Sequence, residues 1–143
     1  MKIHLNLATS DLGRAVSFYS TLLDAEPAKA LTEYALFVTE RPGLELALDL
    51  RDVVSPISDV HYGIYVETPD EVDRAVERLT AAGLVASVER KETCCYADQT
   101  KVWTIDPDGR RWEVYTVHNE TDDRNGDDIT CCSSVLPMRA CCS

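Results

Sequence analysis

The pattern of apolar and polar positions in the first fifty residues predicts a strand, a helix and further strands. Residues 1–8 alternate between apolar and polar side chains, which is the period of a half-buried strand. Apolar residues then recur at helical spacing over residues 11–24, and Ser10 precedes them as the expected N-terminal cap. About three strands follow, with clear stretches at residues 33–40 and 44–50.

The second half of the chain repeats this order of elements. Residues 59–67 alternate again, and Thr68 begins a helix with proline in the first position and Glu71 three residues after the cap. The helix is expected to end at Gly83. Three more strands are predicted near residues 85–90, 100–106 and 110–117.

The repeat predicts an α+β fold. Each unit is too small to bury its own sheet face, so we expect two paired βαβββ modules that form one cupped sheet with the helices outside. A single domain is expected over residues 1–118, with repeats at about 1–52 and 57–118. Residues 119–143 are polar, acidic and aperiodic, which predicts a flexible tail.

Charge and composition narrow the possible partners. The net charge of −11 disfavours nucleic acid and anionic membrane surfaces, because both attract proteins with an excess of Lys and Arg. No apolar run approaches the roughly 20 residues that span a bilayer, and the N-terminus becomes polar too early for a signal peptide. A cytoplasmic protein is expected, and both a monomer and a homodimer fit the sequence.

All six cysteines occur in adjacent pairs. In the cytoplasm thiols stay reduced, so a metal ligand or a nucleophile is expected before a disulfide. Neighbouring α carbons lie about 3.8 Å apart, whereas disulfides prefer about 4.4–6.8 Å, so an adjacent pair remains open and can close both sulfurs on one soft atom. The pairs are Cys94–Cys95, expected in a loop between strands, and Cys131–Cys132 and Cys141–Cys142 in the tail.

Two histidines occupy corresponding places in the repeats. His4 and His61 lie in the first strand of each unit, on the face opposite the helix-packing residues, and strand parity lets Glu113 point the same way. A histidine in a strand is commonly an ordinary polar residue, but the equivalence of the two positions favours metal ligands. Two imidazoles and one carboxylate suit Fe(II), and zinc, nickel, manganese or cobalt could bind there too. His118 has no counterpart and is expected to be exposed.

The sequence carries a family resemblance in its motifs. The start H-L-N-L-A-T-S-D-L-G-R-A-V, His61 at the start of a strand and the ending D-P-D-G-R-R-W-E-V-Y resemble the vicinal oxygen chelate superfamily, which includes glyoxalases, extradiol dioxygenases and fosfomycin-resistance proteins. The resemblance covers residues 1 to about 117. Within it, T-C-C-Y-A-D-Q-T-K-V-W-T-I-D-P-D-G-R-R-W-E-V-Y closely resembles the carbon–arsenic lyases that degrade trivalent organoarsenicals, and the related cadmium-induced proteins.

This resemblance implies a function and a site. It implies an Fe(II) centre held by residues matching His4, His61 and Glu113, a substrate thiol pair matching Cys94 and Cys95, and dioxygen as co-substrate. Four-ligand relatives such as glyoxalases have a further carboxylate in the first repeat. No carboxylate stands at the corresponding place near Ala47, which favours three ligands and disfavours glyoxalase chemistry.

The number of thiols agrees with such a substrate. Methylarsonous acid has two exchangeable hydroxyls and one carbon, so two thiols can bind arsenic and leave the As–C bond free, whereas inorganic arsenite would suit three. Cleavage of methylarsonous acid or of trivalent aromatic arsenicals is expected to release arsenite and an oxidised organic fragment, from a mobile thiol loop. The tail pairs either pass arsenic inward or have no role in this reaction.

Two other functions fit the same residues. One is a cadmium- or arsenic-binding sequestration protein, because the chain has three thiol pairs and resembles cadmium-induced proteins. The other is a different enzyme of the same superfamily, of the extradiol dioxygenase or thiol transferase type, for which Cys94 would be dispensable.

Overall fold

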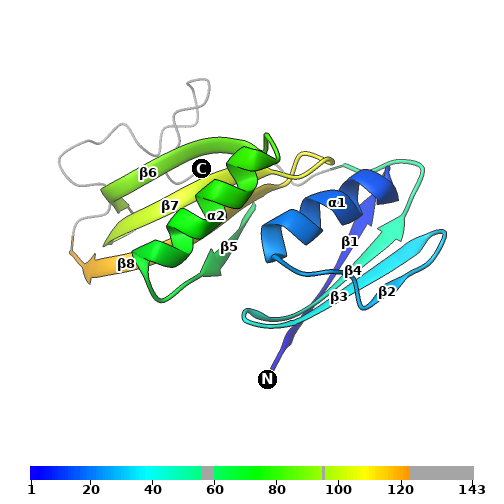
Figure 1. Cartoon of the computed structure of the whole chain (residues 1–143), viewed down its shortest axis with the longest axis horizontal. Helices are drawn as coiled ribbons and strands as arrows, with labels where there is room; N and C mark the ends of the chain where they lie inside the picture. Colours follow the sequence, from blue (N-terminus) through cyan, green and yellow to red (C-terminus); the bar gives the residue numbers. More distant parts are fainter. Residues whose placement is uncertain (56–59, 95, 123–143) are drawn as a thin grey trace. The chain divides into compact units, whose positions relative to one another are not determined.

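The computed structural model describes residues 1–55, 60–94 and 96–122, and two βαβββ modules follow each other along the chain (Figure 1). The first contains β1 (Ile3–Thr9), α1 (Leu12–Leu23), β2 (Lys29–Ala30), β3 (Tyr34–Glu40) and β4 (Gly43–Leu50). The second contains β5 (His61–Tyr65), α2 (Pro69–Ala81), β6 (Val85–Cys94), β7 (Ala97–Ile105) and β8 (Arg111–Glu120). The predicted fold class is confirmed.

Each module forms one four-stranded sheet. The strand orders are β1-β4-β3-β2 and β5-β8-β7-β6, with the first strand parallel to the last in both. Contacts divide the chain into two compact units. Residues 1–58 and 105–110 belong to the first, and the remaining residues belong to the second, so the connection between β7 and β8 is part of the first unit.

The core of the first unit lies between α1 and its sheet. Leu22 of α1 is buried with Leu46 and Leu48 of β4, and the ring of Tyr19 lies 6.5 Å from that of Phe37. The predicted cap of α1 is wrong by one residue. Asp11 is the N-cap, because its Oδ1 accepts a hydrogen bond from the Arg14 amide at 3.0 Å.

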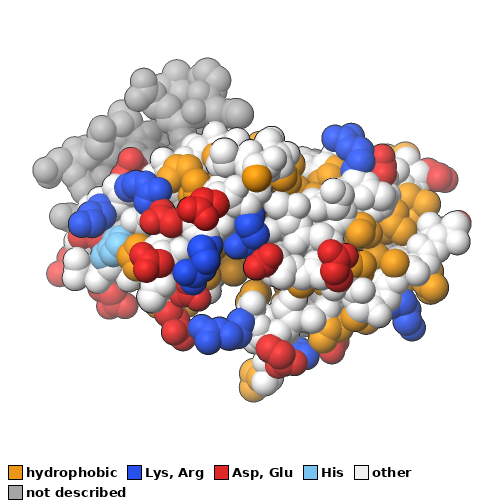
Figure 2. All heavy atoms as spheres, in the orientation of Figure 1, with side chains coloured by type: hydrophobic (Ala, Val, Ile, Leu, Met, Phe, Trp, Pro, Cys, Tyr) orange, Lys and Arg blue, Asp and Glu red, His pale blue; other side chains and the backbone are white. Residues whose placement is uncertain are grey.

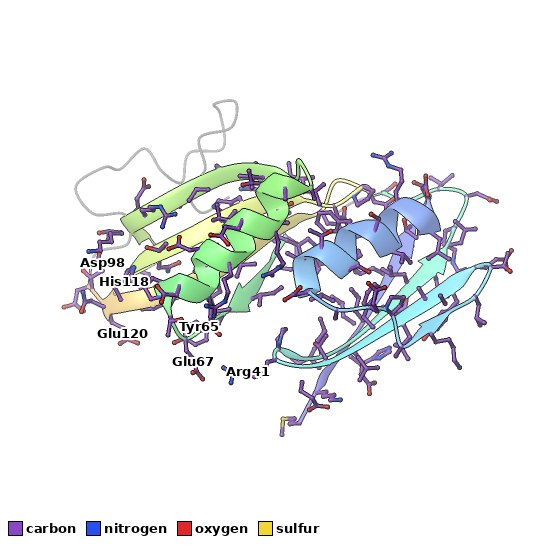
Figure 3. All side chains as sticks on the ribbon, viewed as in Figure 1. Arg41, Tyr65, Glu67, Asp98, His118 and Glu120 are labelled. Atoms are coloured by element: carbon purple, nitrogen blue, oxygen red, sulfur yellow. The ribbon has the colours of Figure 1, made fainter. Side chains whose placement is uncertain are left out.

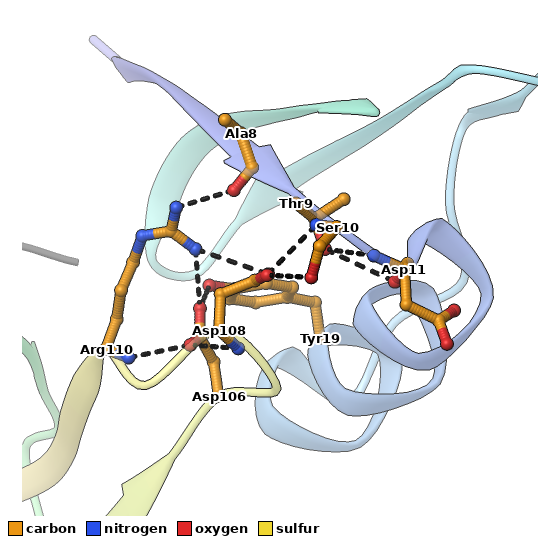
Figure 4. A network of polar contacts seen from close by, with 8 residues as sticks. All are labelled: Ala8, Thr9, Ser10, Asp11, Tyr19, Asp106, Asp108 and Arg110. Atoms are coloured by element: carbon orange, nitrogen blue, oxygen red, sulfur yellow. Dashed lines mark hydrogen bonds and ion pairs between the residues drawn. The ribbon is translucent and has the colours of Figure 1, made fainter. Parts of the chain in front are cut away.

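Ser10 instead contacts the segment 105–110, which contains the D-P-D-G motif (Figure 4). Its hydroxyl donates to Asp108 Oδ1 at 2.8 Å. The buried carboxylate of Asp106 accepts from the Tyr19 hydroxyl at 2.7 Å and from Arg110 Nη1 at 3.0 Å. Burial alone would raise the pKa of Asp108, but hydrogen bonds from Thr9 and Ser10 and the charge of Arg110 lower it. Polar contacts thus anchor this segment in the first unit.

The core of the second unit lies between α2 and its sheet. Tyr62 of β5 stacks on Trp112 of β8 at 4.8 Å, and Val72 and Leu79 of α2 are fully buried. Thr68 caps α2 as predicted, and Gly83 adopts the left-handed backbone conformation after the helix ends. Neither helix in the described part of the chain is long and apolar enough to cross a membrane.

The β6–β7 hairpin corrects one prediction. Sequence analysis placed Cys94 and Cys95 in a loop, but β6 continues to Cys94, which pairs with Ala97 at the start of β7. Cys95 lies outside the described residues. Ala97 and Gln99, both in β7, are buried. The two strands extend because they pair with each other beyond the predicted ends. On the face of the second unit seen in Figure 2, the described basic and acidic side chains are interspersed.

Candidate metal and substrate site

His61 and Glu113 lie side by side on one face of the second sheet. Strands β5 and β8 run parallel with Gly63 opposite Glu113, and Nε2 of His61 is 3.6 Å from Oε1 of Glu113. Side chains alternate along a strand, so both point away from the face that buries Trp112 and Val114. The structure therefore brings together two of the three predicted metal ligands.

Gly63, which lies opposite Glu113, has no side chain to fill the space beside the Glu113 carboxylate. A Cβ atom there would lie 2.9 Å from Cε1 of Tyr115 and 3.2 Å from Oε1 of Glu113. Burial raises the pKa of the Tyr115 phenol, and the negative charge of Glu113 raises it further. The absence of a side chain at Gly63 thus lets Tyr115 and the Glu113 carboxylate approach the sheet backbone.

A buried lysine holds the other oxygen of Glu113. Nζ of Lys101 in β7 lies 3.3 Å from Oε2 of Glu113, with side chains 3% and 9% exposed. Opposite charges at this distance offset part of the cost of removing both from water. Sequence analysis missed this pair, although a lysine inside the apolar stretch T-K-V-W-T indicated a buried charge that needs a partner.

Trp103 and Glu89 extend this polar face. The ring of Trp103 lies 5.3 Å from that of His61 in an edge-to-face arrangement, and its Nε1 donates to Oε1 of Glu89 at 3.1 Å. Burial raises the pKa of Glu89 to about 7, although the positive charge of Lys101 opposes the shift. Sequence analysis missed Glu89 too. Its pairing opposite Lys101 depends on the register of the hairpin, which a single sequence does not supply.

His4 belongs to the first unit. It lies opposite Glu45 in the ladder, and its Nδ1 is 3.6 Å from Oε2 of Glu45, with the two side chains 59% and 46% exposed. The place that corresponds to Glu113 is Ala47, since Ala47 pairs with Asn6 as Glu113 pairs with Gly63. The predicted lack of a carboxylate there agrees with this register. Glu45 and Asp49 lie on the same face of β4, two residues before and two residues after Ala47.

The structure describes only part of the predicted thiols. The backbone of Cys94 ends β6, whereas Cys95 and the tail pairs Cys131–Cys132 and Cys141–Cys142 lie outside the described residues. Their predicted roles stay predictions.

The predicted exposure of His118 is wrong. His118 lies within β8, is half-buried, and its Nε2 is 2.8 Å from Oγ1 of Thr100. The strand continues to Glu120, three residues past the predicted end at residue 117, and the backbone amide of Thr121 still donates to the Tyr96 carbonyl at 2.8 Å. His118 is therefore part of the second unit's hydrogen-bond network.

The donor chemistry of the second unit fits part of an Fe(II) centre. In the described part of the chain, no three His, Cys, Asp or Glu side chains converge closely enough to hold a metal ion. His61 and Glu113 supply one imidazole and one carboxylate, which are two ligands of a 2-His-1-carboxylate set. Oε2 of Glu113 is buried against Lys101, whereas Oε1 faces His61 and is the oxygen that could bind a cation together with that imidazole.

Comparison with known proteins places the chain in a family. The model of the Glyoxalase/Bleomycin resistance protein/Dioxygenase superfamily matches residues 3–114. The chain belongs to this superfamily, as its motifs predicted. Its fold resembles a glyoxalase/bleomycin resistance protein/dioxygenase from Alicyclobacillus acidocaldarius, with a TM-score of 0.68, 19% identity, and coverage of 83% of this chain and 92% of that one. It also resembles the fosfomycin resistance protein FosX from Listeria monocytogenes, with a TM-score of 0.64 and 20% identity. That match covers 80% of this chain and 90% of the FosX chain.

Curated relatives of higher sequence identity show which members of the superfamily this chain resembles. A protein from Bacillus sp. (strain MD1), named trivalent organoarsenical cleaving enzyme, is 37% identical over 98% of this chain and 89% of its own length. The cadmium-induced protein CadI of Mycobacterium bovis is 39% identical over 97% of both chains. The predicted resemblance to both groups is confirmed.

Proposed function

We propose that this protein is an enzyme that cleaves the carbon–arsenic bond of trivalent organoarsenicals with Fe(II) and dioxygen. The observation that carries the proposal is the 3.6 Å approach of His61 and Glu113 on one sheet face. It is supported by the 37% identity to a relative named for organoarsenical cleavage. Methylarsonous acid and trivalent aromatic arsenicals are the proposed substrates.

The adjacent thiols of Cys94 and Cys95 would bind the substrate. Each thiol replaces one hydroxyl on arsenic, so two As–S bonds form, two As–O bonds break and two water molecules leave. The oxidation state of arsenic does not change in this step. The As–C bond is the third bond of arsenic and remains available for cleavage.

His61 and Glu113 would hold the metal, together with His4 as the third ligand predicted from the sequence. Bound Fe(II) supplies the capacity to activate dioxygen. Lys101 contacts Oε2 of Glu113 and so limits the rotation of the carboxylate, which leaves Oε1 directed toward His61. For methylarsonous acid, the overall reaction with one dioxygen balances as arsenous acid plus formaldehyde.

The test measures arsenite released from methylarsonous acid by anaerobically purified, reduced protein loaded with Fe(II). Release is expected only after dioxygen is admitted, and it should be lost in Cys94→Ser, His61→Ala and Glu113→Ala. Glu77→Ala, which removes an exposed carboxylate from α2, is the matched control and should behave like the wild type. Turnover that persists under strict anoxia, or in Glu113→Ala, would rule out the proposal.

The cadmium-induced relative supports a second candidate, a protein that sequesters Cd(II) or As(III). A sequestering protein would bind these ions stoichiometrically without turnover, and His61→Ala would bind as well as the wild type. Metal analysis of anaerobically purified protein together with the turnover assay separates the two functions.

A further inference from the structure

Strand β6 contains a bulge shortly before the cysteine that ends it. Glu89 pairs with Lys101 and Glu92 pairs with Gln99, so two residues of β6 stand opposite Thr100 alone. One of these two, Lys91, has a φ of 52°. This value lies in the left-handed region, which residues other than glycine rarely adopt. Bulges turn the strand and redirect the side chains that follow. Here the redirected segment ends at Cys94.

Two side chains, one from β7 and one from β8, form a chain of hydrogen bonds to the backbone of the bulge. The amide of Lys91 donates to Oγ1 of Thr100 at 3.2 Å, and the same Oγ1 is 2.8 Å from Nε2 of His118. Thr100 is buried, and a hydroxyl can accept from one group while it donates to another. We call these three groups, the Lys91 amide, the Thr100 hydroxyl and the His118 ring, the bulge lock. It links β6, β7 and β8 at one level.

Beyond the bulge lock the hairpin is held at two further points. Oγ1 of Thr93 donates to Oδ1 of Asp98 at 2.7 Å, and the carbonyl of Tyr96 accepts from the Thr121 amide at 2.8 Å. Figure 3 shows Asp98 and His118 at the same end of the second sheet. The backbone that carries Cys94 is therefore fixed on both sides, with the bulge as the point that sets its register.

We propose that Thr100 and His118 are positioning residues for the substrate thiols, because the bulge lock sets the register of the strand that presents Cys94. Without the Thr100 hydroxyl, the Lys91 amide loses its partner and the bulge can relax. A slip of one residue would exchange the two sheet faces along the segment that ends at Cys94. The inference rests on the proposed function for the identity of the ligand.

The test uses phenylarsine oxide, which offers two exchangeable positions on trivalent arsenic. Binding is measured without iron under reducing, anaerobic conditions, so turnover does not enter. The parent is the full chain with the four tail cysteines replaced by serine (Cys131→Ser, Cys132→Ser, Cys141→Ser and Cys142→Ser), since those thiols would bind the probe too.

Thr100→Val and His118→Ala are expected to raise the Kd for phenylarsine oxide roughly tenfold or more, because a misdirected thiol loses the second As–S bond. Thr100→Ser keeps the hydroxyl and should restore the parent's Kd. The matched control is Thr104→Val. Thr104 is also buried in β7 and donates to the Leu84 carbonyl at 2.7 Å, at the end of the hairpin away from Cys94. The Thr104→Val variant should have a lower free energy of unfolding in urea and the same Kd for phenylarsine oxide as the parent.

Three outcomes would overturn the assignment. Parent-like affinity in both Thr100→Val and His118→Ala would show that the bulge lock does not position the thiols. An equal loss in Thr104→Val would reduce its role to general stability. A parent that fails to bind the probe, or one whose affinity survives Cys94→Ser, would overturn the proposed substrate thiols and this inference with them.

Discussion

Glu89 is a carboxyl group that the fold keeps partly protonated at neutral pH. Burial raises its pKa from 4.5 to about 7, and Glu92 and Glu113 raise it while Lys101 and the Trp103 hydrogen bond oppose the shift. Between these two values the folded protein binds a proton that the unfolded chain has released. The contribution of this group to stability is therefore present below about pH 4.5 and is lost as the pH rises through about 7.

Glu89→Gln should remove this dependence, because the amide stays neutral and can still accept from Trp103. The free energy of unfolding of the wild type, relative to Glu89→Gln, should fall as the pH is raised from about 5 to about 8. Urea unfolding of both proteins across this range measures the difference. Parallel curves for the two proteins would contradict the assigned ionisation.

A second prediction concerns the glycine beside the proposed ligands. Gly63→Ala places a methyl group 2.9 Å from the Tyr115 ring and 3.2 Å from Oε1 of Glu113. The ring and the carboxylate must shift, at a cost of about 1–3 kcal/mol in the free energy of unfolding. The shift would also weaken binding of Co(II), measured by its visible absorption as a substitute for iron.

Gly13→Ala is the control for this change, because a Cβ there would meet only Oδ1 of Asp11, at the ordinary distance of 3.6 Å. It should leave Co(II) binding unchanged. Equal Co(II) affinity in the wild type and Gly63→Ala would show that Glu113 does not need this space.

At the scale of single elements, the N-terminus of α2 depends on one carboxylate. Oε2 of Glu71 accepts from the amides of Glu67 and Thr68 at 3.1 and 3.0 Å, and from the Thr68 hydroxyl at 3.0 Å. Glu71→Ala should lower the free energy of unfolding by about 1 kcal/mol, since two amides lose their acceptor. Urea unfolding measures this loss. Glu77→Ala, an exposed change in the same helix, should cost less, and an equal cost would contradict the capping role.

The strands and helices were predictable wherever the spacing of apolar residues stayed regular along the whole element. Alternation alone placed His61 and Glu113 on one face, and the cap at Thr68 followed from the spacing to Glu71. The bulge at Lys91 was not predictable, because one additional residue in a strand leaves no mark on the pattern of a short polar stretch. Past the bulge the ladder resumes and pairs Cys94 with Ala97.

At the scale of the whole molecule, the sequence revealed the repeat but not which segments each unit includes. Lys101 and Glu89 complete the polar face around Glu113 through strand pairing, which depends on register and not on residue type. The membership of residues 105–110 in the first unit was likewise hidden, since the chain reaches them directly from β7. Contacts between distant segments require the fold itself.

The segment 105–110 makes a prediction about the stability of the first unit. Asp106 is fully buried and accepts from the Tyr19 hydroxyl, the Arg110 side chain and the amides of Asp108 and Arg110. Asp106→Ala would leave the Arg110 charge buried without this partner, so the free energy of unfolding should fall by about 3–5 kcal/mol. Amide hydrogen exchange should become faster in β1 and α1, which belong to the same unit.

Two comparisons separate this anchoring role from a general effect of lost charge. Asp52→Ala removes an exposed carboxylate from the same unit and should change the free energy of unfolding by less than about 0.5 kcal/mol. Combining Asp106→Ala with Arg110→Met should recover part of the loss, because a buried charge without a partner is costlier than an apolar side chain in its place. If the double variant is no more stable than Asp106→Ala, the loss arises from packing, and the buried ion pair does not anchor the segment.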